Sequence, residues 1–230
     1  PIKSSAASDV YKRQILFIPS MPVKEKLSYG TQLNVLKKKI IWYSIIAVTL
    51  INGALFGFFS YMSDYLRTVT EVSYSVISVL LLIYGLAHII GNVIAGKQLA
   101  TNPIRSMTFI PFALFTFYIC IFILGEWLAA MAVIILILGI LAGYGQNTMQ
   151  YMITEAAPEA PDFANGLFLL SANLGTTVGA AVCGAFITFF DTRYSVIGSL
   201  LFLAVSIVFV VLRIRTVQSS KTIKLKVVAQ

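Results

Sequence analysis

The chain has 230 residues, of which 58% are hydrophobic and only 11% are charged, and its mean hydropathy is +0.88. Soluble domains are about a quarter charged. This composition cannot cover the surface of a water-soluble globule, and it predicts a protein whose surrounding solvent is largely lipid. The net charge of +8 does not indicate nucleic-acid binding, because Lys and Arg lie in short segments beside apolar runs, as in membrane proteins.

The first 39 residues are predicted to lie outside the main fold. Residues 1–14 resemble a translated sequencing adaptor and lack the apolar core of a signal peptide, so we leave them out of the fold prediction. Residues 15–39 are expected to comprise the end of a truncated apolar helix and a cytoplasmic linker. This interpretation makes the chain a fragment of a longer protein.

Six apolar runs follow, each close to the roughly 20 residues that a helix needs to cross a bilayer. They cover residues 40–62, 76–95, 106–125, 127–149, 164–190 and 194–212. Strands of a membrane barrel would be about ten residues long with strict alternation. We therefore predict an all-α membrane protein, with a six-helix transmembrane bundle over residues 40–214 and a basic cytoplasmic tail over residues 215–230.

The distribution of Lys and Arg predicts the orientation of this bundle. One side carries twelve of these residues in its loops and ends, whereas the other side carries only Arg67 and Arg193. Positive residues are retained on the cytoplasmic side of a membrane. Both ends of the bundle are therefore expected to be cytoplasmic.

The six runs differ in their polar content. The third and sixth are almost wholly apolar and are expected to be outermost, facing lipid. The other four carry amides and one histidine: Asn52, His88, Asn92, Gln146, Asn147 and Asn173. Polar groups within a bilayer turn toward protein or a water-filled path, so these four helices are predicted to face an interior.

Small residues recur three or four positions apart along the fifth run, with Gly175, Gly179 and Gly184 among them. They form a smooth face that another helix can approach closely. This face could be a sliding contact between two halves of a transporter or a static helix contact. The spacing by itself favours the static contact.

Two stretches carry a resemblance to a known family. Ala156-Ala157-Pro158-Glu159-Ala160, followed by Asn165-Gly166, Asn173-Leu174-Gly175, Gly179 and Gly184, resembles the eleventh helix of the major facilitator superfamily. It is most similar to the drug-proton antiporter and arabinose-efflux permease group. The segment 91–97, with Gly91, Gly96 and Lys97, and then Arg105, resembles the weaker copy of the cytoplasmic loop motif between helices eight and nine. The Asp that is usual in this motif is missing.

The resemblance, which covers residues 15–214, implies one half of a major facilitator superfamily fold with a missing N-terminal six-helix half as its partner. It implies a secondary transporter in a bacterial cytoplasmic membrane, without a cofactor, that exports a small organic solute such as a drug or a sugar with proton coupling. Helices seven and ten of that family line the central cavity. This would place Asn52, Phe56, Gln146, Asn147 and Gln150 there as candidate substrate contacts, although the three residues of the fourth run could instead cap a helix. His88 and Asn173 are further candidates for the substrate path.

The titratable groups leave the coupling mechanism open. His88 is the only histidine and could carry a proton, but a histidine hydrogen-bonded between helices is the favoured interpretation. No Asp or Glu lies within a predicted span, so the essential titrating group is expected in the missing half. No catalytic or metal-binding set of residues is present, and Cys120 and Cys183 are interpreted as packing residues. The main alternative function is a six-span membrane scaffold that does not transport.

Overall fold

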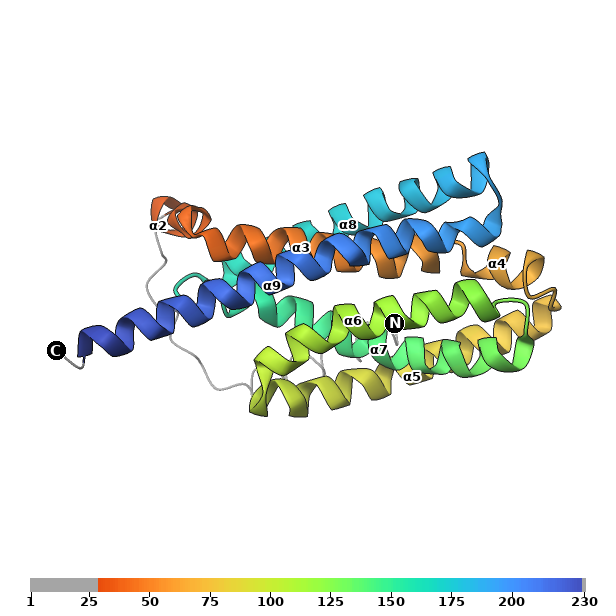
Figure 1. Cartoon of the computed structure of the whole chain (residues 1–230), viewed down its shortest axis with the longest axis horizontal. Coiled ribbons are helices and arrows are strands. Elements are labelled where there is room, and N and C mark those ends of the chain that lie inside the picture. The colour runs from red at the N-terminus through yellow and green to blue at the C-terminus, as the bar shows by residue number, and fades with distance from the viewer. Residues whose placement is uncertain (1–28, 229–230) are drawn as a thin grey trace, which may run out of the picture.

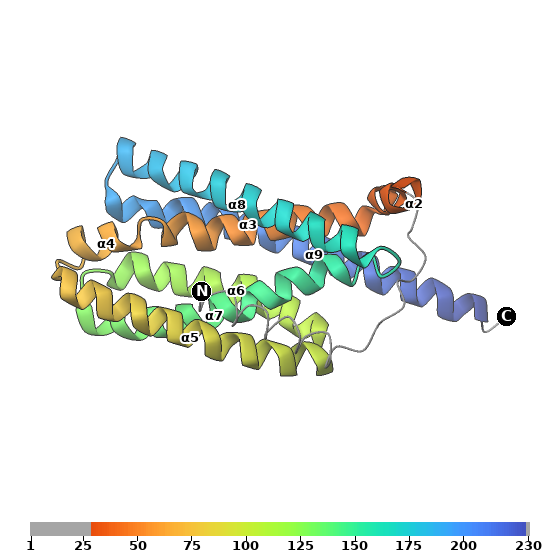
Figure 2. The same cartoon turned by 180° about the vertical axis from the view of Figure 1, so that it is seen from behind.

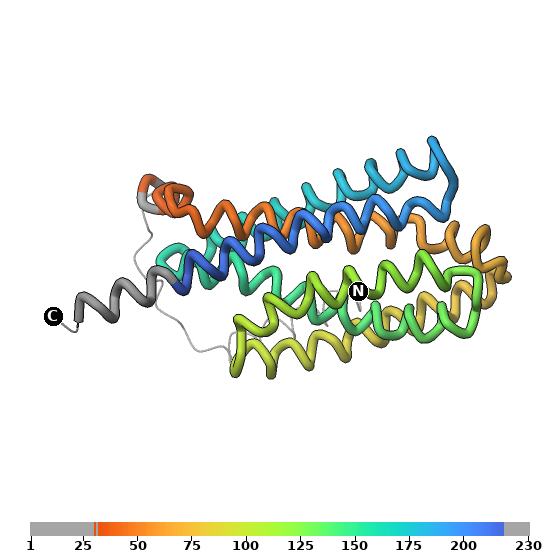
Figure 3. The backbone as a smooth tube through the Cα atoms, in the orientation of Figure 1, coloured from red at the N-terminus to blue at the C-terminus, as the bar shows by residue number. Residues whose placement is uncertain are grey.

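The computed structural model describes residues 29–228, except for the side chains of residues 29, 31 and 219–228. Residues 1–28, and with them the interpretation of residues 1–14 and most of 15–39, lie outside this range. The path of the chain can be followed in Figure 3. Its elements are α2 (Tyr29–Leu33), η1 (Asn34–Lys37), α3 (Lys39–Phe59), α4 (Met62–Thr68), α5 (Tyr74–Thr101), α6 (Pro103–Leu124), α7 (Leu128–Thr154), α8 (Pro161–Phe189), η2 (Thr192–Tyr194) and α9 (Ser195–Val228).

Six of these helices are long and apolar enough to cross a membrane. They are α3, α5, α6, α7, α8 and α9, and they correspond in order to the six apolar runs. The described residues contain no strand. The all-α fold with six membrane-spanning helices, predicted from run length and apolar composition, is therefore confirmed.

The six long helices lie in layers (Figures 1 and 2). Helices α6 and α9 pack side by side on one face, α5 and α8 lie on the opposite face, and α3 and α7 lie between them. The central position of α3 and α7 agrees with their burial, since 56% of the residues in the apolar window of each are buried.

The prediction that the third and sixth spans are the outermost needs one correction. In this chain α5 is the most exposed span, with 22% of its window buried against 33% for α6 and 39% for α9. Helix α6 buries a full stripe from Ser106 to Ile121, because it packs on both α7 and α9. Apolarity thus identified helices that lack polar groups, and not helices that lack neighbours.

The order of packing interlocks the two halves of the sequence. Helices α3, α5 and α6 form the first sequence triplet, and α7, α8 and α9 form the second. In space α3 packs mainly on α8 and α9, whereas α7 packs mainly on α5 and α6. The first helix of each triplet is therefore held by the second and third helices of the other.

Glycines bring α3 and α8 into backbone contact. A Cβ added to Gly57 of α3 would lie 2.8 Å from the carbonyl oxygen of Gly179 in α8, closer than real Cβ atoms come to any neighbour. A Cβ on Gly175 or Gly179 would likewise collide with the backbone of α3. In lipid, helices associate through such close packing of small residues. The small-residue face predicted on α8 is therefore a helix contact within this chain.

Glycines also bring α5 and α7 into backbone contact. A Cβ on Gly139 of α7 would lie 2.5 Å from the carbonyl oxygen of Tyr84, and Cβ atoms on Gly91 and Gly143 would overlap the carbonyl oxygens of Ile140 and His88. Both tight pairs thus combine the first helix of one triplet with the second helix of the other.

The segment interpreted as a loop motif is helical. Gly91, Gly96 and Lys97 lie within α5, which runs on to Thr101, and Arg105 lies in the first turn of α6. Only Asn102 separates the two helices, because Pro103 can begin a helix but cannot continue one. Gly91 is a contact residue against α7, whereas a Cβ on Gly96 would meet nothing within 4 Å.

We predict that Gly179→Leu destabilises the bundle by about 1–3 kcal/mol, the usual cost of overpacking a fitted contact. Gly166→Leu is the matched control, because Gly166 lies in the same helix and a Cβ there would meet nothing within 4 Å. Thermal unfolding of the two variants in lipid nanodiscs measures the difference. Equal melting temperatures would show that the α3–α8 contact can give way to a large side chain.

Candidate functional site

A row of aromatic and amide side chains crosses three helices and forms the candidate site. We call it the aromatic–amide band, and its members are Phe56 and Phe59 of α3, Tyr84, His88 and Asn92 of α5, and Asn147 of α7. The ring centroids of Phe56 and Phe59 are 6.2 Å apart, those of Phe59 and Tyr84 are stacked at 5.0 Å, and those of Tyr84 and His88 are 6.4 Å apart. The row thus continues from α3 onto α5.

The amide end of the band joins α5 to α7. Asn147 Nδ2 donates to Asn92 Oδ1 at 2.6 Å and also to the carbonyl oxygen of Gly143 at 3.2 Å. Asn92 Nδ2 lies 3.3 Å from His88 Nδ1 and can donate to it when the imidazole carries its proton on Nε2. Glycine packing between α5 and α7 brings these short side chains within reach of one another.

The members of the band are neither buried nor fully exposed. Phe59 is 38% exposed, and the other five are half-buried. In Figure 2, α5 and α8 lie nearest the viewer, and parts of α3 and α7 are visible between them. Side chains that are positioned by neighbours and still accessible are what a binding surface for a small molecule requires.

The remaining amides of α7 lie close to the band. Gln146 is half-buried beside Asn147, and Gln150 is exposed one turn further on. Gln150 Nε2 donates to Asn165 Oδ1 of α8 at 3.0 Å. Because Gln150 bonds a side chain of the next helix, it links α7 to α8, and the alternative that it caps α7 is not supported by this bond.

Asn52 lies apart from the band, contrary to the expectation that it lines a substrate path. Its side chain is 1% exposed, and its Nδ2 donates to the carbonyl oxygen of Ala172 at 2.5 Å and to Thr176 Oγ1 at 2.9 Å. Both partners belong to α8. The adjacent Gly53 lets α8 approach so closely that Asn52 becomes an interhelical hydrogen-bonding residue.

Asn173 and Gly184 lie apart from the band. Asn173 is exposed, and its Nδ2 donates to Leu169 O of its own helix at 2.8 Å. It does not join the other amides within this half, and its place on a substrate path stays a prediction. Gly184 was predicted to be a helix-packing residue. A Cβ there would collide with the hydroxyl of Tyr61, which lies between α3 and α4. The small-residue face therefore ends on an aromatic ring.

Sequence reasoning missed a buried arginine. Arg213 of α9 was counted only among the twelve Lys and Arg residues of the cytoplasmic side, yet it is only 2% exposed. Its Nη2 binds Glu155 Oε2 at 2.6 Å and the carbonyl oxygen of Met152 at 3.0 Å. Its Nε donates to Ser44 Oγ at 2.9 Å, and its Nη1 contacts Met107 Sδ at 3.0 Å. One side chain therefore connects α9 to α3, α6 and α7. The positions of Arg213 and Glu155, each at the end of a span on the same predicted side, were the available signal.

A second ion pair lies at the same end of the bundle. Lys38 Nζ is 2.5 Å from Glu159 Oε1, and it also donates to the carbonyl oxygen of Ala156 at 3.4 Å. The hydrogen bond from Lys38 holds the pKa of Glu159 below its usual value. Both partners are about 40% exposed, so this pair contributes little to stability by itself.

Fold and site together define a polytopic helical membrane protein with an accessible polar band. The family model of the Major Facilitator Superfamily matches residues 41–228, and the chain belongs to this superfamily. The interlocked triplets agree with this assignment, because each half of such transporters contains two inverted three-helix repeats.

Curated relatives have diverse names. The chain is 30% identical to the uncharacterized MFS-type transporter YtbD of Bacillus subtilis over 70% of this chain and 43% of the relative. It is 27% identical to the transcription regulatory protein OpdE of Pseudomonas aeruginosa over 65% of this chain and 38% of the relative. It is 22% identical to a probable sugar efflux transporter of Pasteurella multocida over 85% of this chain and 48% of the relative. The chain thus spans less than half the length of these relatives.

We predict that Glu155→Gln destabilises the bundle by about 1–3 kcal/mol, because it leaves the Arg213 guanidinium buried without its counter-charge. The matched control is Glu126→Gln, which breaks the ion pair of Glu126 with Arg193 at the opposite end, where both side chains are at least 35% exposed. An exposed pair of this kind contributes less than about 1 kcal/mol. Denaturant unfolding in nanodiscs compares the two variants, and equal losses would refute a special role for Arg213.

Proposed function

We propose that this chain is one six-helix half of a secondary transporter that exports a small organic solute across a bacterial cytoplasmic membrane. The substrate path lies between this half and a second six-helix half of the same protein. Both ends of the bundle described here are cytoplasmic, in accord with the excess of Lys and Arg on that side. Transport proceeds by alternating motion of the two halves about the site.

The aromatic–amide band is the observation that carries this proposal. It is held by the tight pairing of α5 and α7, and its side chains remain accessible on the side of the bundle where α5 and α8 leave apolar faces uncovered. A second half packed on those two faces would enclose the band between the halves. The band would then form one wall of a central cavity.

The chemistry of the band suits an organic solute with a ring and polar substituents. Phe59 and Tyr84 supply flat apolar surfaces, while Asn92, Asn147 and Gln146 supply both donors and acceptors. Sugars present such a combination of apolar faces and hydroxyl groups, and several relatives are named as probable sugar efflux transporters. We therefore propose a sugar or a similarly polar organic molecule as the substrate.

Proton coupling is assigned to the other half. Asp and Glu are absent from the six described spans, apart from Asp162 in the first turn of α8. Changes in intramembrane charge drive many transport cycles. His88 is bonded through Asn92 to Asn147, which suits a residue that fixes the geometry of the band. An enzymatic function is not proposed.

A membrane protein without transport activity is the second candidate, and the relative named as a transcription regulatory protein favours it. A scaffold of that kind has no use for accessible amides linked across two helices. The two functions differ in whether the full-length protein moves a solute, so a flux assay distinguishes them.

For the full-length protein in proteoliposomes, we predict proton-gradient-dependent flux of at least one radiolabelled mono- or disaccharide. Asn147→Ala should raise the KM about tenfold, because one substrate hydrogen bond and the bond that positions Asn92 are both lost. Asn173→Ala is the matched control, since that amide is exposed and bonds only its own helix. No flux above protein-free vesicles for any sugar would reject the proposed substrate class, and equal effects of the two variants would reject the band as the site.

We further predict that His88→Gln keeps substantial proton-dependent flux. Gln can replace the hydrogen bond to Asn92 but cannot shuttle a proton. The assay is flux against an imposed pH gradient, with substrate binding and protein yield measured in parallel. Loss of coupled flux together with normal binding would place the coupling group in this half.

A further inference from the structure

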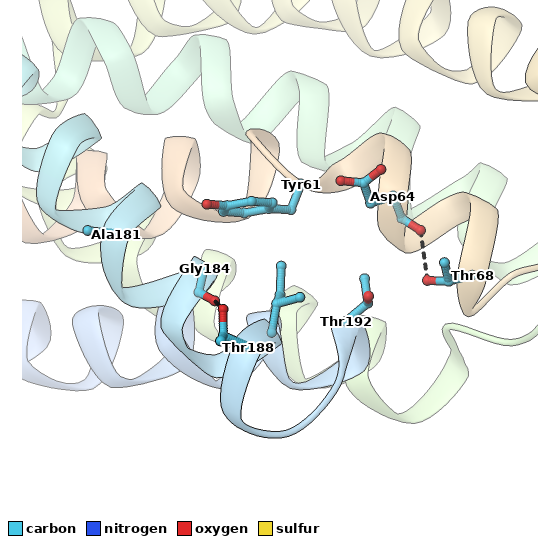
Figure 4. A pocket seen from close by; sticks show the side chains of 8 residues that line it. Tyr61, Asp64, Thr68, Ala181, Gly184, Thr188 and Thr192 are labelled. Atoms are coloured by element: carbon cyan, nitrogen blue, oxygen red, sulfur yellow. Dashed lines mark hydrogen bonds between the residues drawn. The ribbon is translucent and has the colours of Figure 1, made fainter.

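A second site lies at the end of the bundle that carries Arg193, away from the amide end of the aromatic–amide band. A pocket of about 490 Å³ opens between α4 and the end of α8 (Figure 4). Small-molecule sites usually have volumes of about 300–1,000 Å³. The lining side chains are Tyr61, Asp64, Thr68, Ala181, Gly184, Ile187, Thr188 and Thr192. None of them belongs to the band.

The pocket is formed by regular helix faces. Tyr61, which directly precedes α4, and Asp64 and Thr68 within it are spaced three and four residues apart, so their side chains lie on one face of the helix. Ala181, Gly184 and Thr188 share one face of α8 in the same way. Gly184 leaves room for the Tyr61 ring, which is fixed by a bond of 3.2 Å from its hydroxyl to the carbonyl oxygen of Ala180.

Three of the four hydroxyl groups in the lining already donate a hydrogen bond within the protein. The hydroxyl of Thr68 donates to Asp64 O at 2.8 Å, and that of Thr188 donates to Gly184 O at 2.9 Å, as drawn in Figure 4. The Tyr61 hydroxyl is likewise a committed donor. Each of these oxygens keeps lone pairs for a ligand, and the Asp64 carboxylate accepts only.

Neither arginine at this end neutralises Asp64. Arg193 Nη1 binds Glu126, its Nη2 binds the carbonyl oxygen of Phe122, and the guanidinium lies 5.3 Å from the centroid of the Phe122 ring. Arg67 Nη1 donates to the carbonyl oxygen of Val72, and its guanidinium lies over the Tyr74 ring. Within the described residues, Asp64 has no cationic partner.

We infer that this pocket binds the primary ammonium group of a small organic cation. The Asp64 carboxylate supplies the charge, the threonine oxygens accept the remaining N–H bonds, and the Tyr61 ring and Ile187 contact the organic part. An anion would meet the Asp64 carboxylate and three hydroxyl groups that already donate elsewhere, so the lining disfavours it. The site adds a cation-binding function to the proposed sugar path and does not depend on the identity of the transported solute.

The test uses the full-length protein in nanodiscs of phosphatidylglycerol, a lipid without an ammonium group, with phenethylammonium as the probe. Calorimetry should detect binding that Asp64→Asn weakens about fivefold or more, as expected for the loss of one partly exposed ion pair. Thr188→Val should weaken it less. The control is Glu71→Gln, which removes a carboxylate from the same end but outside the pocket lining, and it should leave the affinity unchanged.

A neutral probe of the same shape, 2-phenylethanol, tests whether charge drives the binding, and it should bind more weakly than the ammonium. Nanodiscs with added phosphatidylethanolamine distinguish a soluble ligand from a lipid headgroup. Competition by that lipid in the native protein and not in Asp64→Asn would assign the ammonium to the membrane. Absence of phenethylammonium binding, or equal binding by the native protein and Asp64→Asn, would overturn the inference while leaving the flux experiments unaffected.

Discussion

The close approach of α3 to α8 and of α5 to α7 is the constraint on which the rest of the structure depends. Lipid is as apolar as the helix surfaces, so the hydrophobic effect does not drive these helices together. The available force is contact between backbones, and a side chain at Gly57, Gly143 or Gly179 would remove it. Because α3 and α7 are the central helices, these two contacts hold α8 and α5 against the centre of the bundle.

The polar contacts follow from the glycine contacts. Asn52 precedes Gly53 and bonds α8, while Asn92 follows Gly91 and accepts from Asn147 of α7. A short amide reaches across only where two backbones are already close. The two tight pairs are therefore similar in construction but differ in exposure, since Asn52 is buried whereas Asn92 and Asn147 are half-buried. Of these three amides, only those of the second pair are accessible enough for the ligand contacts proposed above.

This difference explains what the sequence could and could not predict. Six spans follow directly from the length of the apolar runs, and the small face around Gly175 and Gly179 follows from helical spacing. The helix that packs on that face could not be predicted, because Gly53 and Gly57 lie more than a hundred residues away in the sequence. Nothing else in their run indicates a contact with α8. The expectation for Asn52 failed for the same reason. The burial of Arg213 was not predicted, because a charge at the end of an apolar run is usually solvated. Its four partners lie on helices α3, α6 and α7, and the sequence does not specify that these helices lie beside α9.

Hydrogen bonds and ion pairs connect the helices at both ends of the bundle and restrict their motion relative to one another. Arg213 joins α9 and α3 to α6 and α7, so it connects the two interlocked groups of helices at one end. At the other end, Arg193 of η2 binds Glu126 between α6 and α7, and Tyr65 donates to Ile121 O. In the middle, Tyr118 of α6 donates to Ala54 O of α3. If α3, α8 and α9 slid past α5, α6 and α7, the bonds at both ends and in the middle of the bundle would break together. The six helices are therefore tied together as one body in the described residues. If the proposed function holds, the change between conformations would take place at the uncovered faces of α5 and α8.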